Sequence, residues 1–337
     1  MLRNTTESLQ AIYAPIHVDL ERVESLLRDQ FRSDFRFIDT LAGYGLRLAG
    51  KRLRPALVLL SGVACGAVTS DHHTMAVVVE MIHTATLVHD DVLDDSRMRR
   101  HTATLNTLFD NETAVLFGDY LLARAIRVAM DVNRDGIPSM LAETTQRIVE
   151  GELRQVGSRG ESDLPESEYE SIIRGKTAAL CECCTRIGAT LAGARADVVN
   201  ALAEYAGALG MAFQVADDLL DLSGNESEAG KSLGTDLEKR KMTLPLIHLL
   251  REATPADRRE INALLAEPTA ETRQELRPWF GKYRSADYAR WRAAGFIAAA
   301  NEALDRAMAA GAAGDGECAT AIEALRRLAD FTVTRRH

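Results

Sequence analysis

Two segments of the chain carry aspartates in the pattern Asp-Asp-x-x-Asp, each at the end of an apolar run. They are Asp90-Asp91-Val92-Leu93-Asp94 and Asp217-Asp218-Leu219-Leu220-Asp221. On a helix, the first and fifth positions of this pattern lie on one face about one turn apart, where like charges repel. A hard cation such as Mg²⁺ offsets this repulsion, since it takes carboxylate oxygens and leaves positions open for substrate phosphates. The two clusters together predict a site for several Mg²⁺ ions.

A solvated acidic helix face is the alternative explanation for each cluster. Both clusters, however, end strongly apolar segments, and the pattern occurs twice. A surface face predicts neither property, so we favour metal binding. The apolar residues that lead up to the aspartates would then line a hydrophobic pocket below a charged mouth. This combination suits an amphiphile with a diphosphate head and a hydrocarbon tail.

Basic residues in two further segments could bind a second polyanion without metal. Lys51, Arg52 and Arg54 come at an expected helix start, where free backbone N–H groups also favour phosphate. Arg99 and Arg100 follow the first aspartate cluster, and the arginine fork suits phosphate oxygens. An ordinary solvated basic surface is the alternative explanation for these five residues.

His83 lies seven residues before Asp90, and therefore on nearly the same helix face. A lone histidine on an apolar helix is by default a core residue with one hydrogen bond. Its alignment with Asp90 favours a role in ligand binding instead.

The bulk properties exclude several classes of protein. The chain has 337 residues and a formal net charge of −9, which gives no electrostatic support for a nucleic-acid partner. It shows no secretory signal, no apolar run long enough to span a bilayer and no lipidation motif, so we expect a cytoplasmic protein. Five cysteines without a secretion signal argue against disulfides. Cys181, Cys183 and Cys184 have the wrong spacing for zinc and are expected to pack in the core.

Helical periodicity dominates the chain, and convincing strands are missing. The segment 74–93 is apolar nearly all round, so we expect it to be the buried central helix that carries the first aspartate cluster. No composition typical of a linker divides the chain, which predicts one domain over residues 1–337. Other helices are expected at 16–27, 34–48, 55–63, 112–132, 138–156, 166–174, 176–192, 197–222, 243–251 and 256–265 and in the C-terminal part, with loops at 157–163 and 223–235.

Specific motifs in this sequence resemble those of the trans-isoprenyl diphosphate synthases, most closely the bacterial long-chain enzymes of the octaprenyl type. The resemblance runs from about residue 12 to the C-terminus. Its motifs are Gly50-Lys51-Arg52-Leu53-Arg54-Pro55, His83 to Asp94, Met98-Arg99-Arg100, Gly118-Asp119, Glu150-Gly151-Glu152, Lys176-Thr177, Gln214 with Asp217 to Asp221, Gly230-Lys231, and Lys241-Met242-Thr243-Leu244-Pro245. The resemblance implies an all-α bundle of antiparallel helices around a central cavity (the isoprenoid synthase fold), and a homodimer.

The resemblance also assigns roles to residues. It implies that isopentenyl diphosphate binds at Lys51, Arg54, His83 and Arg100. It implies that Mg²⁺ binds at Asp90, Asp94, Asp217 and Asp221. It implies contacts to the allylic prenyl diphosphate from Arg99, Lys176, Thr177, Gln214, Lys231 and Lys241. In the implied mechanism, Mg²⁺ together with Arg99, Lys176 and Lys241 stabilises the leaving diphosphate, and isopentenyl diphosphate attacks the resulting allylic cation.

The residues just before Asp90 bear on product length. In this family they form the near floor of the tail pocket, and here Ala85 and Thr86 are both small. An open path deeper along the helix predicts a product of about six to ten isoprene units, since no bulky side chain blocks the tail. Leu141 is a candidate for the true floor. Close helix packing is the alternative explanation for the two small residues.

Three other functions stay open. A shorter-chain farnesyl or geranylgeranyl diphosphate synthase would share every motif. A terpene cyclase ionises the same kind of substrate, but does not need the basic set for a second diphosphate. A non-catalytic subunit of a heteromeric synthase would be expected to lose catalytic carboxylates, and this chain keeps both sets.

Overall fold

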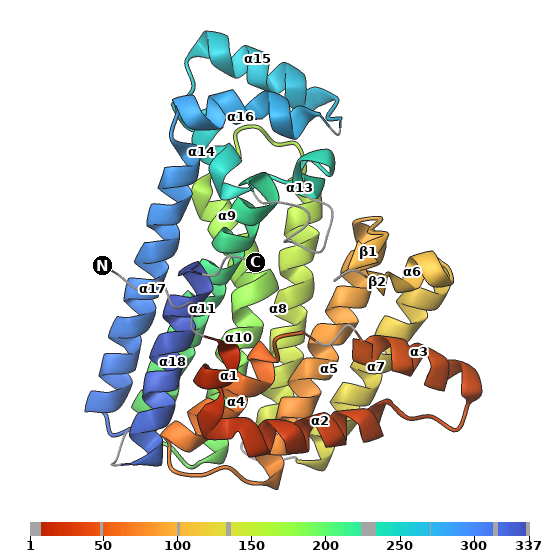
Figure 1. Ribbon diagram of the computed structural model, residues 1–337, viewed down its shortest axis with the longest axis vertical. Helices are drawn as coiled ribbons and strands as arrows, with labels where there is room; N and C mark the ends of the chain where they lie inside the picture. The colour runs from red at the N-terminus through yellow and green to blue at the C-terminus, as the bar shows by residue number, and fades with distance from the viewer. Residues whose placement is uncertain are drawn as a thin grey trace.

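The computed structural model describes residues 8–47, 50–99, 102–132, 136–223, 234–269, 271–312 and 316–334, and these are almost entirely helical (Figure 1). The elements in chain order are α1 (Leu9–Ile12), the 3-10 turn η1 (Ala14–Ile16), α2 (His17–Phe31), α3 (Arg36–Arg47), α4 (Leu53–Ala64), α5 (Ser70–Leu93), β1 (Met98–Arg99), β2 (Thr102–Ala103), α6 (Leu105–Leu108), α7 (Asn111–Asp131), α8 (Ile137–Gly157), α9 (Glu166–Ile173), the π-helical turn η2 (Arg174–Ala178), α10 (Ala179–Leu191), α11 (Ala196–Ser223), α13 (Thr235–Glu238), α14 (Leu244–Glu252), α15 (Pro255–Ala266), α16 (Thr272–Lys282), α17 (Ser285–Ala309) and α18 (Glu317–Thr334). The predicted all-α class is confirmed.

Helix α5 is the central element that the sequence predicted. Its apolar residues from Met75 to Ile82 are almost fully buried, because α2, α4, α7 and α10 surround it. It begins at Ser70, four residues earlier than predicted. A capping box explains this start: the Thr69 amide donates to His72 Nδ1 at 3.1 Å, and the Thr69 hydroxyl reaches the same first turn.

Helix α11 carries the second aspartate cluster at its C-terminal end. It packs along α17 on one side and against α10 on the other. In Figure 1, α5, α8, α10 and α11 run side by side through the middle of the molecule, while α15 and α16 lie at one end. The aspartate-bearing end of α5 is held by the main hydrophobic core, and that of α11 by a second apolar cluster that includes Met211 and Val215.

Three cysteines on α10 lie in the core, as predicted. Cys181, Cys183 and Cys184 are buried, and all five cysteines of the chain are free thiols. Among the helices of the described ranges, none combines the length and the apolar character that a membrane span requires.

The structure corrects two local expectations. Met98–Arg99 and Thr102–Ala103 form a short antiparallel strand pair, in which Met98 faces Ala103. Two residues per strand are too few for the alternating pattern that reveals strands in a sequence. Pro55 does not open its helix, because α4 already begins at Leu53. A proline is tolerated throughout the first helical turn, so it did not fix the first residue.

A π-helical turn joins α9 to α10 where the sequence predicted two helices with a break at residue 175. Gly151 of α8 and Gly175 of the turn make this junction possible. A Cβ on Gly151 would lie 2.6 Å from the Lys176 backbone nitrogen, and one on Gly175 would lie 2.9 Å from the Arg147 carbonyl oxygen. The two backbones therefore touch, and this contact holds Lys176 and Thr177 against α8.

Candidate active site

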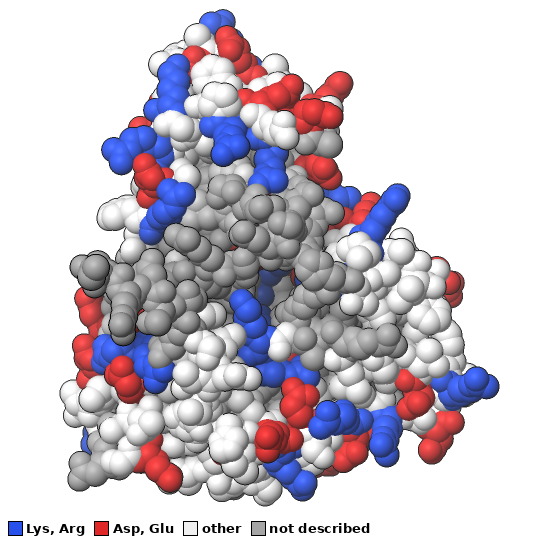
Figure 2. Space-filling model, in the orientation of Figure 1, with Lys and Arg blue, Asp and Glu red and all other residues white. Residues whose placement is uncertain are grey.

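A cavity of about 780 Å³ opens between the ends of α5 and α11. Its wall includes Asp94 and Asp217 from the two aspartate clusters, and Leu87, Phe213 and Leu220 supply apolar surface beside them. On the face drawn in Figure 2, Lys and Arg side chains lie inside a central hollow. The structure thus brings the predicted acidic, basic and apolar groups to one place. The cationic residues in its wall are Lys51, Arg52, Arg54, Arg97, Arg99 and Lys239.

Asp94 of the first cluster meets a cation from a distant segment. Lys241 Nζ lies 2.8 Å from Asp94 Oδ2 and also 3.4 Å from Asp236. Burial acts to raise the pKa of Asp94, but Lys241, with help from Lys176 and Arg159, holds that pKa below its usual value. The other oxygen, Asp94 Oδ1, is buried and makes no hydrogen bond to any described residue.

Lys176 is buried beside the same cluster. Its ammonium lies 2.5 Å from Glu152 Oε2 and donates to Gln155 Oε1 at 2.9 Å. Burial acts to lower the pKa of Lys176, but the charges of Asp90 and Glu152 raise it above its ordinary value. Lys176 therefore stays protonated and close to Asp90. Glu152 was part of a predicted motif, but its pairing with Lys176 was not predicted.

The second aspartate of each cluster is buried and has its own partner. Arg99 Nε donates to Asp91 Oδ1 at 2.8 Å, and Tyr169 Oη donates to Asp218 Oδ2 at 2.7 Å. Burial raises the pKa of Asp91 to about 6 and that of Asp218 to about 7. These two carboxylates fix neighbouring side chains, while Asp94 of the first cluster and Asp217 of the second line the cavity. Asp90 and Asp221 are not part of the cavity wall. Tyr169, which lies on α9, was not predicted.

Residues expected at the allylic diphosphate are linked to the second cluster. Thr177 Oγ1 donates to Gln214 Oε1 at 2.8 Å, and Gln214 Nε2 donates to Asp218 Oδ1 at 2.9 Å. Asp221 is only 3% exposed and accepts a 3.3 Å hydrogen bond from the Asp236 amide. The π turn and α13 therefore both rest on the end of α11.

The basic segment before α4 divides into two kinds of residue. Lys51 and Arg54 line the cavity together with His83, and the buried Nε of Arg54 has no hydrogen-bonding partner among the described residues. Arg52 instead forms an ion pair with Glu80 at 2.6 Å and a second one with Glu24. Arg52 is thus a structural residue, although its guanidinium also borders the cavity. Arg100 and Lys231 lie outside the described residues.

The carboxylates suit a hard divalent cation. Across the described ranges, no three carboxylate, thiol or imidazole groups converge into a ready-made metal site. Mg²⁺ does not need such a cage, because it is usually held by one or two carboxylates together with waters and substrate phosphates. Asp94 Oδ1 offers an oxygen of this kind, since it makes no hydrogen bond to a described residue and lies 3.9 Å from the Arg159 guanidinium. The donor set therefore fits Mg²⁺ bound jointly with a phosphate ligand.

Of the residues predicted to set product length, Ala85 and Leu141 are buried and Thr86 is half-buried. Ala85 is 1% exposed and Leu141 on α8 is 3% exposed, while the Thr86 hydroxyl donates to the His83 carbonyl oxygen at 2.8 Å. The α5 residues in the cavity wall are Glu80, His83, Leu87 and Asp94. The structure does not bring the three chain-length residues into that wall.

Comparison with known proteins gives consistent matches over most of the chain. Residues 36–279 match the family model described as polyprenyl synthetase. The octaprenyl diphosphate synthase of Escherichia coli (strain K12) is 36% identical over 249 residues, which span 74% of this chain and 77% of that protein. A polyprenyl synthase from Caulobacter crescentus CB15, solved with calcium and isoprenyl diphosphate, has a TM-score of 0.91 at 32% identity, covering 99% of this chain and 100% of that one. A decaprenyl diphosphate synthase from Rhodobacter capsulatus has a TM-score of 0.87 at 34% identity, covering 97% and 98% of the two chains.

Proposed function

Since this chain belongs to the polyprenyl synthetase family, whose members are prenyltransferases, we propose that it is a long-chain trans-polyprenyl diphosphate synthase. It would condense isopentenyl diphosphate head to tail onto an allylic prenyl diphosphate, with several Mg²⁺ ions per site. The observation that carries this proposal is the cavity whose wall contains one aspartate of each cluster, a basic set and apolar side chains. Relatives that make octaprenyl, nonaprenyl and decaprenyl diphosphate support a long product.

The basic residues divide into two groups that suit two diphosphates. Lys51, Arg54 and His83 lie at the α4–α5 side of the cavity, where Arg54 Nε, which has no partner within the described ranges, can donate to isopentenyl diphosphate. Lys176 and Lys241 lie against the aspartates, on the side where the allylic diphosphate would bind. Arg99, Thr177, Gln214 and Lys231 belong to the same proposed allylic site, and Arg100 belongs to the proposed isopentenyl site.

The two buried lysines would supply most of the electrostatic stabilisation of the leaving diphosphate. Negative charge grows on the leaving diphosphate as the allylic C–O bond breaks, and a cation fixed nearby stabilises that charge. The pKa values of Lys176 and Lys241 are both raised by neighbouring carboxylates, so both lysines stay charged. Mg²⁺ at Asp90, Asp94, Asp217 and Asp221 would add charge stabilisation of the same kind when bound. The apolar wall would keep water from the allylic cation.

An exposed apolar surface supports the predicted homodimer. Large apolar side chains on α7 are 40–60% exposed, and two on α8 are 52% and 66% exposed; they are Val115, Leu116, Ile126, Met130, Val149 and Leu153. Helices α7 and α8 pack against each other, and exposed apolar side chains gathered on neighbouring helices mark protein–protein contacts. We place the subunit interface on this surface, with each chain a single domain and the dimer in the cytoplasm.

Product analysis by the purified chain tests the function directly. The protein would be incubated with Mg²⁺, labelled isopentenyl diphosphate and farnesyl diphosphate, and the products separated by reversed-phase chromatography. We expect linear prenyl diphosphates of long chain length, and no product after chelation of the metal. A cyclic hydrocarbon would point to a cyclase, a product of farnesyl or geranylgeranyl length to a short-chain synthase, and no product to a subunit that needs a partner.

A further inference from the structure

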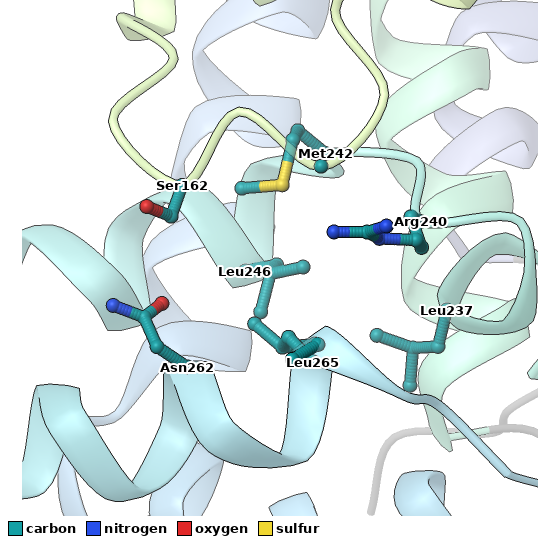
Figure 3. Close-up of a pocket in the computed structure, with 9 residues that line it drawn as sticks. Ser162, Leu237, Arg240, Met242, Leu246, Asn262 and Leu265 are labelled. Carbon is teal, nitrogen blue, oxygen red and sulfur yellow. The ribbon is translucent and has the colours of Figure 1, made fainter.

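A second cavity, of about 230 Å³, lies on the far side of the turn that carries Lys241. Figure 3 shows its wall, which comes from the loop after α8 and from α13, α14 and α15. Four of its side chains are apolar, namely Leu237, Met242, Leu246 and Leu265. Neither the proposed substrates nor the proposed metal ions use this cavity.

Arg240 gives the second cavity its chemical character. Figure 3 shows the guanidinium of Arg240 pointing into the space between Met242 and Leu246, with Asn262 at the opposite side. The backbone of Arg240 has a φ of 55°, in the left-handed region that costs free energy for residues other than glycine. Neither the Arg240 guanidinium nor the Asn262 amide has a hydrogen bond or ion pair with another described residue. The fold thus places the guanidinium of Arg240, a residue with a strained backbone, next to the apolar side chains of the cavity wall.

The chain on either side of Arg240 leads to the active site. Lys239 Nζ lies 3.1 Å from Asp95, and Lys241 Nζ lies 2.8 Å from Asp94. In this turn Lys239 lines the active-site cavity, and Arg240 and Met242 line the second cavity. A backbone movement at Arg240 would therefore also move Lys241, which contacts the first aspartate cluster, and Lys239, which contacts the adjacent Asp95.

A second backbone connection runs through the loop after α8. The Gly160 amide donates to the Arg240 carbonyl oxygen at 2.9 Å. Gly160 lines the second cavity, and its neighbour Arg159 has its guanidinium 3.9 Å from Asp94 Oδ1. Arg240 is therefore connected to Asp94 by two routes, one through its neighbour Lys241 and one through Gly160 and Arg159. A ligand that contacts Arg240 would act on Asp94 through both.

We propose that this cavity is a regulatory site for a small carboxylate with a branched apolar body, and that its occupancy holds Lys241 on Asp94. The regulatory part rests on the proposed function, whereas the binding part does not. A bound carboxylate would pair with Arg240, and the apolar body would cover the leucines and Met242. Because Arg240 would then be fixed, the Lys241–Asp94 ion pair would persist, and Lys241 would be less available to the allylic diphosphate.

The size and charge of the cavity select this ligand class. At a liquid volume of ~30 Å³ per water molecule, the cavity has room for about eight waters, and so for a molecule of about eight heavy atoms. This is below the roughly 300–1,000 Å³ of pockets for drug-sized ligands. One arginine can neutralise one carboxylate through paired hydrogen bonds, whereas a diphosphate would need further cations. We therefore use 4-methylpentanoate as the probe and the neutral 4-methylpentan-1-ol as its uncharged match.

Binding would be measured by saturation-transfer NMR on the full chain without diphosphates. We expect 4-methylpentanoate to bind more tightly than the alcohol. Arg240→Gln should weaken binding of the acid about tenfold, because a hydrogen bond to a charged group is lost. Ala266→Phe, at an exposed residue of the cavity rim, should block binding by filling the space. Arg259→Gln, on the outer face of α15, is the matched control and should bind like wild type.

Equal binding of the probe by wild type, Arg240→Gln and Ala266→Phe would overturn the site. Displacement of the probe by inorganic diphosphate with the same affinity in all four proteins would place the probe in the active site and would also overturn it. Equal binding of the alcohol and the acid would show that Arg240 does not pair with the carboxylate of the probe.

Kinetics test the regulatory part separately. At a saturating probe concentration, the KM for the allylic diphosphate should rise at least threefold in wild type and in Arg259→Gln, but not in Ala266→Phe. Binding without any change in turnover would refute the regulatory role. Absence of product from wild type without the probe would refute the proposed function alone, and the NMR result would still decide whether the site exists.

Discussion

The ammonium of Lys241 lies 2.8 Å from Asp94 Oδ2, and this contact joins positions that are 147 residues apart in the chain. The sequence predicted that Lys241 binds a diphosphate and that Asp94 binds Mg²⁺. In the structure each neutralises the other, so substrate and metal would have to replace an existing ion pair. Binding of the two ligands should therefore depend on one another.

Replacement of Lys241 tests its electrostatic role. Lys241→Gln should lower kcat about a hundredfold, since one fixed donor to the leaving group is lost. Lys241→Arg keeps the charge and should recover part of that loss. Steady-state kinetics would measure both variants beside Lys282→Gln, a control at an exposed lysine of α16. A Lys241→Gln enzyme with the wild-type kcat would exclude this lysine from the chemical step.

Replacement of the first aspartate of each cluster tests the metal assignment. Asp90→Asn and Asp217→Asn should each reduce turnover by about a thousandfold or more, because each removes an oxygen ligand of Mg²⁺. Thermal stability should be kept, since like charges within each cluster repel. Asp131→Asn, on an exposed part of α7, is the control. Near-normal rates of either variant at saturating Mg²⁺ would disprove that its aspartate is a metal ligand.

Two neighbouring arginines should give different phenotypes. Arg54→Ala should raise the KM for isopentenyl diphosphate about tenfold or more, because a charged hydrogen bond to this substrate is lost. Arg52→Ala should instead lower the free energy of unfolding by about 3 kcal/mol, because it leaves the buried Glu80 without its partner. Initial rates and chemical denaturation distinguish the two effects. The assignment fails if Arg54→Ala changes only the KM of the allylic substrate.

Product length should respond to the volume of the residues beside the cavity. Ala85→Phe should shorten the product to farnesyl or geranylgeranyl diphosphate, because an aromatic ring would fill the path of the tail. Leu141→Ala should lengthen it by opening the floor. The added ring also overpacks a residue that is 1% exposed, at a cost of about 1–3 kcal/mol, so stability must be measured with each product profile.

The control for these variants is Ala298→Phe, which adds the same ring to an exposed position of α17. It should leave the product unchanged. An active Ala85→Phe enzyme that still makes the full-length chain would show that the tail does not pass this residue.

His248 should give the protein a component of pH-dependent stability. Burial, followed by the nearby Arg251 charge, lowers the pKa of this histidine, whose Nδ1 lies 3.0 Å from Ser285 Oγ. The unfolded chain then binds more protons than the folded one below the ordinary histidine pKa of about 6.5. The stabilisation is complete above that pH and is lost as the pH falls. Thermal denaturation from pH 8 to pH 5 should show the advantage of wild type over His248→Gln decreasing, and a constant difference would contradict the shift.

The parts of the site that follow from helical periodicity were predictable. The apolar run before Asp90 identified α5, and the spacing of Asp90, Asp94 and Asp217 identified residues whose helices meet at the cavity. These inferences need only the positions of neighbours three and four residues apart, which a sequence displays directly.

The parts that depend on long-range pairing were not predictable. Arg52 was grouped with the ligand-binding cations because nothing nearby shows that Glu24 and Glu80 neutralise it. Tyr169 gave no signal either, since its partner Asp218 is 49 residues away. A tyrosine on an amphipathic helix has no unusual sequence context. Its role becomes visible only when the fold brings a buried carboxylate to its hydroxyl.

The π turn at Arg174–Ala178 has a consequence for how this chain can vary. Such a turn holds one residue more than an α-helical turn, so it is equivalent to a single inserted codon within a continuous helix. Loss of that codon would rotate everything on one side of it by about 100° relative to the other side. Lys176 and Thr177 could not then both face their present partners, Glu152 and Gln214. The direction in which these two side chains point therefore depends on the number of residues in the turn. A point substitution leaves that number unchanged, so it can neither create nor restore this direction.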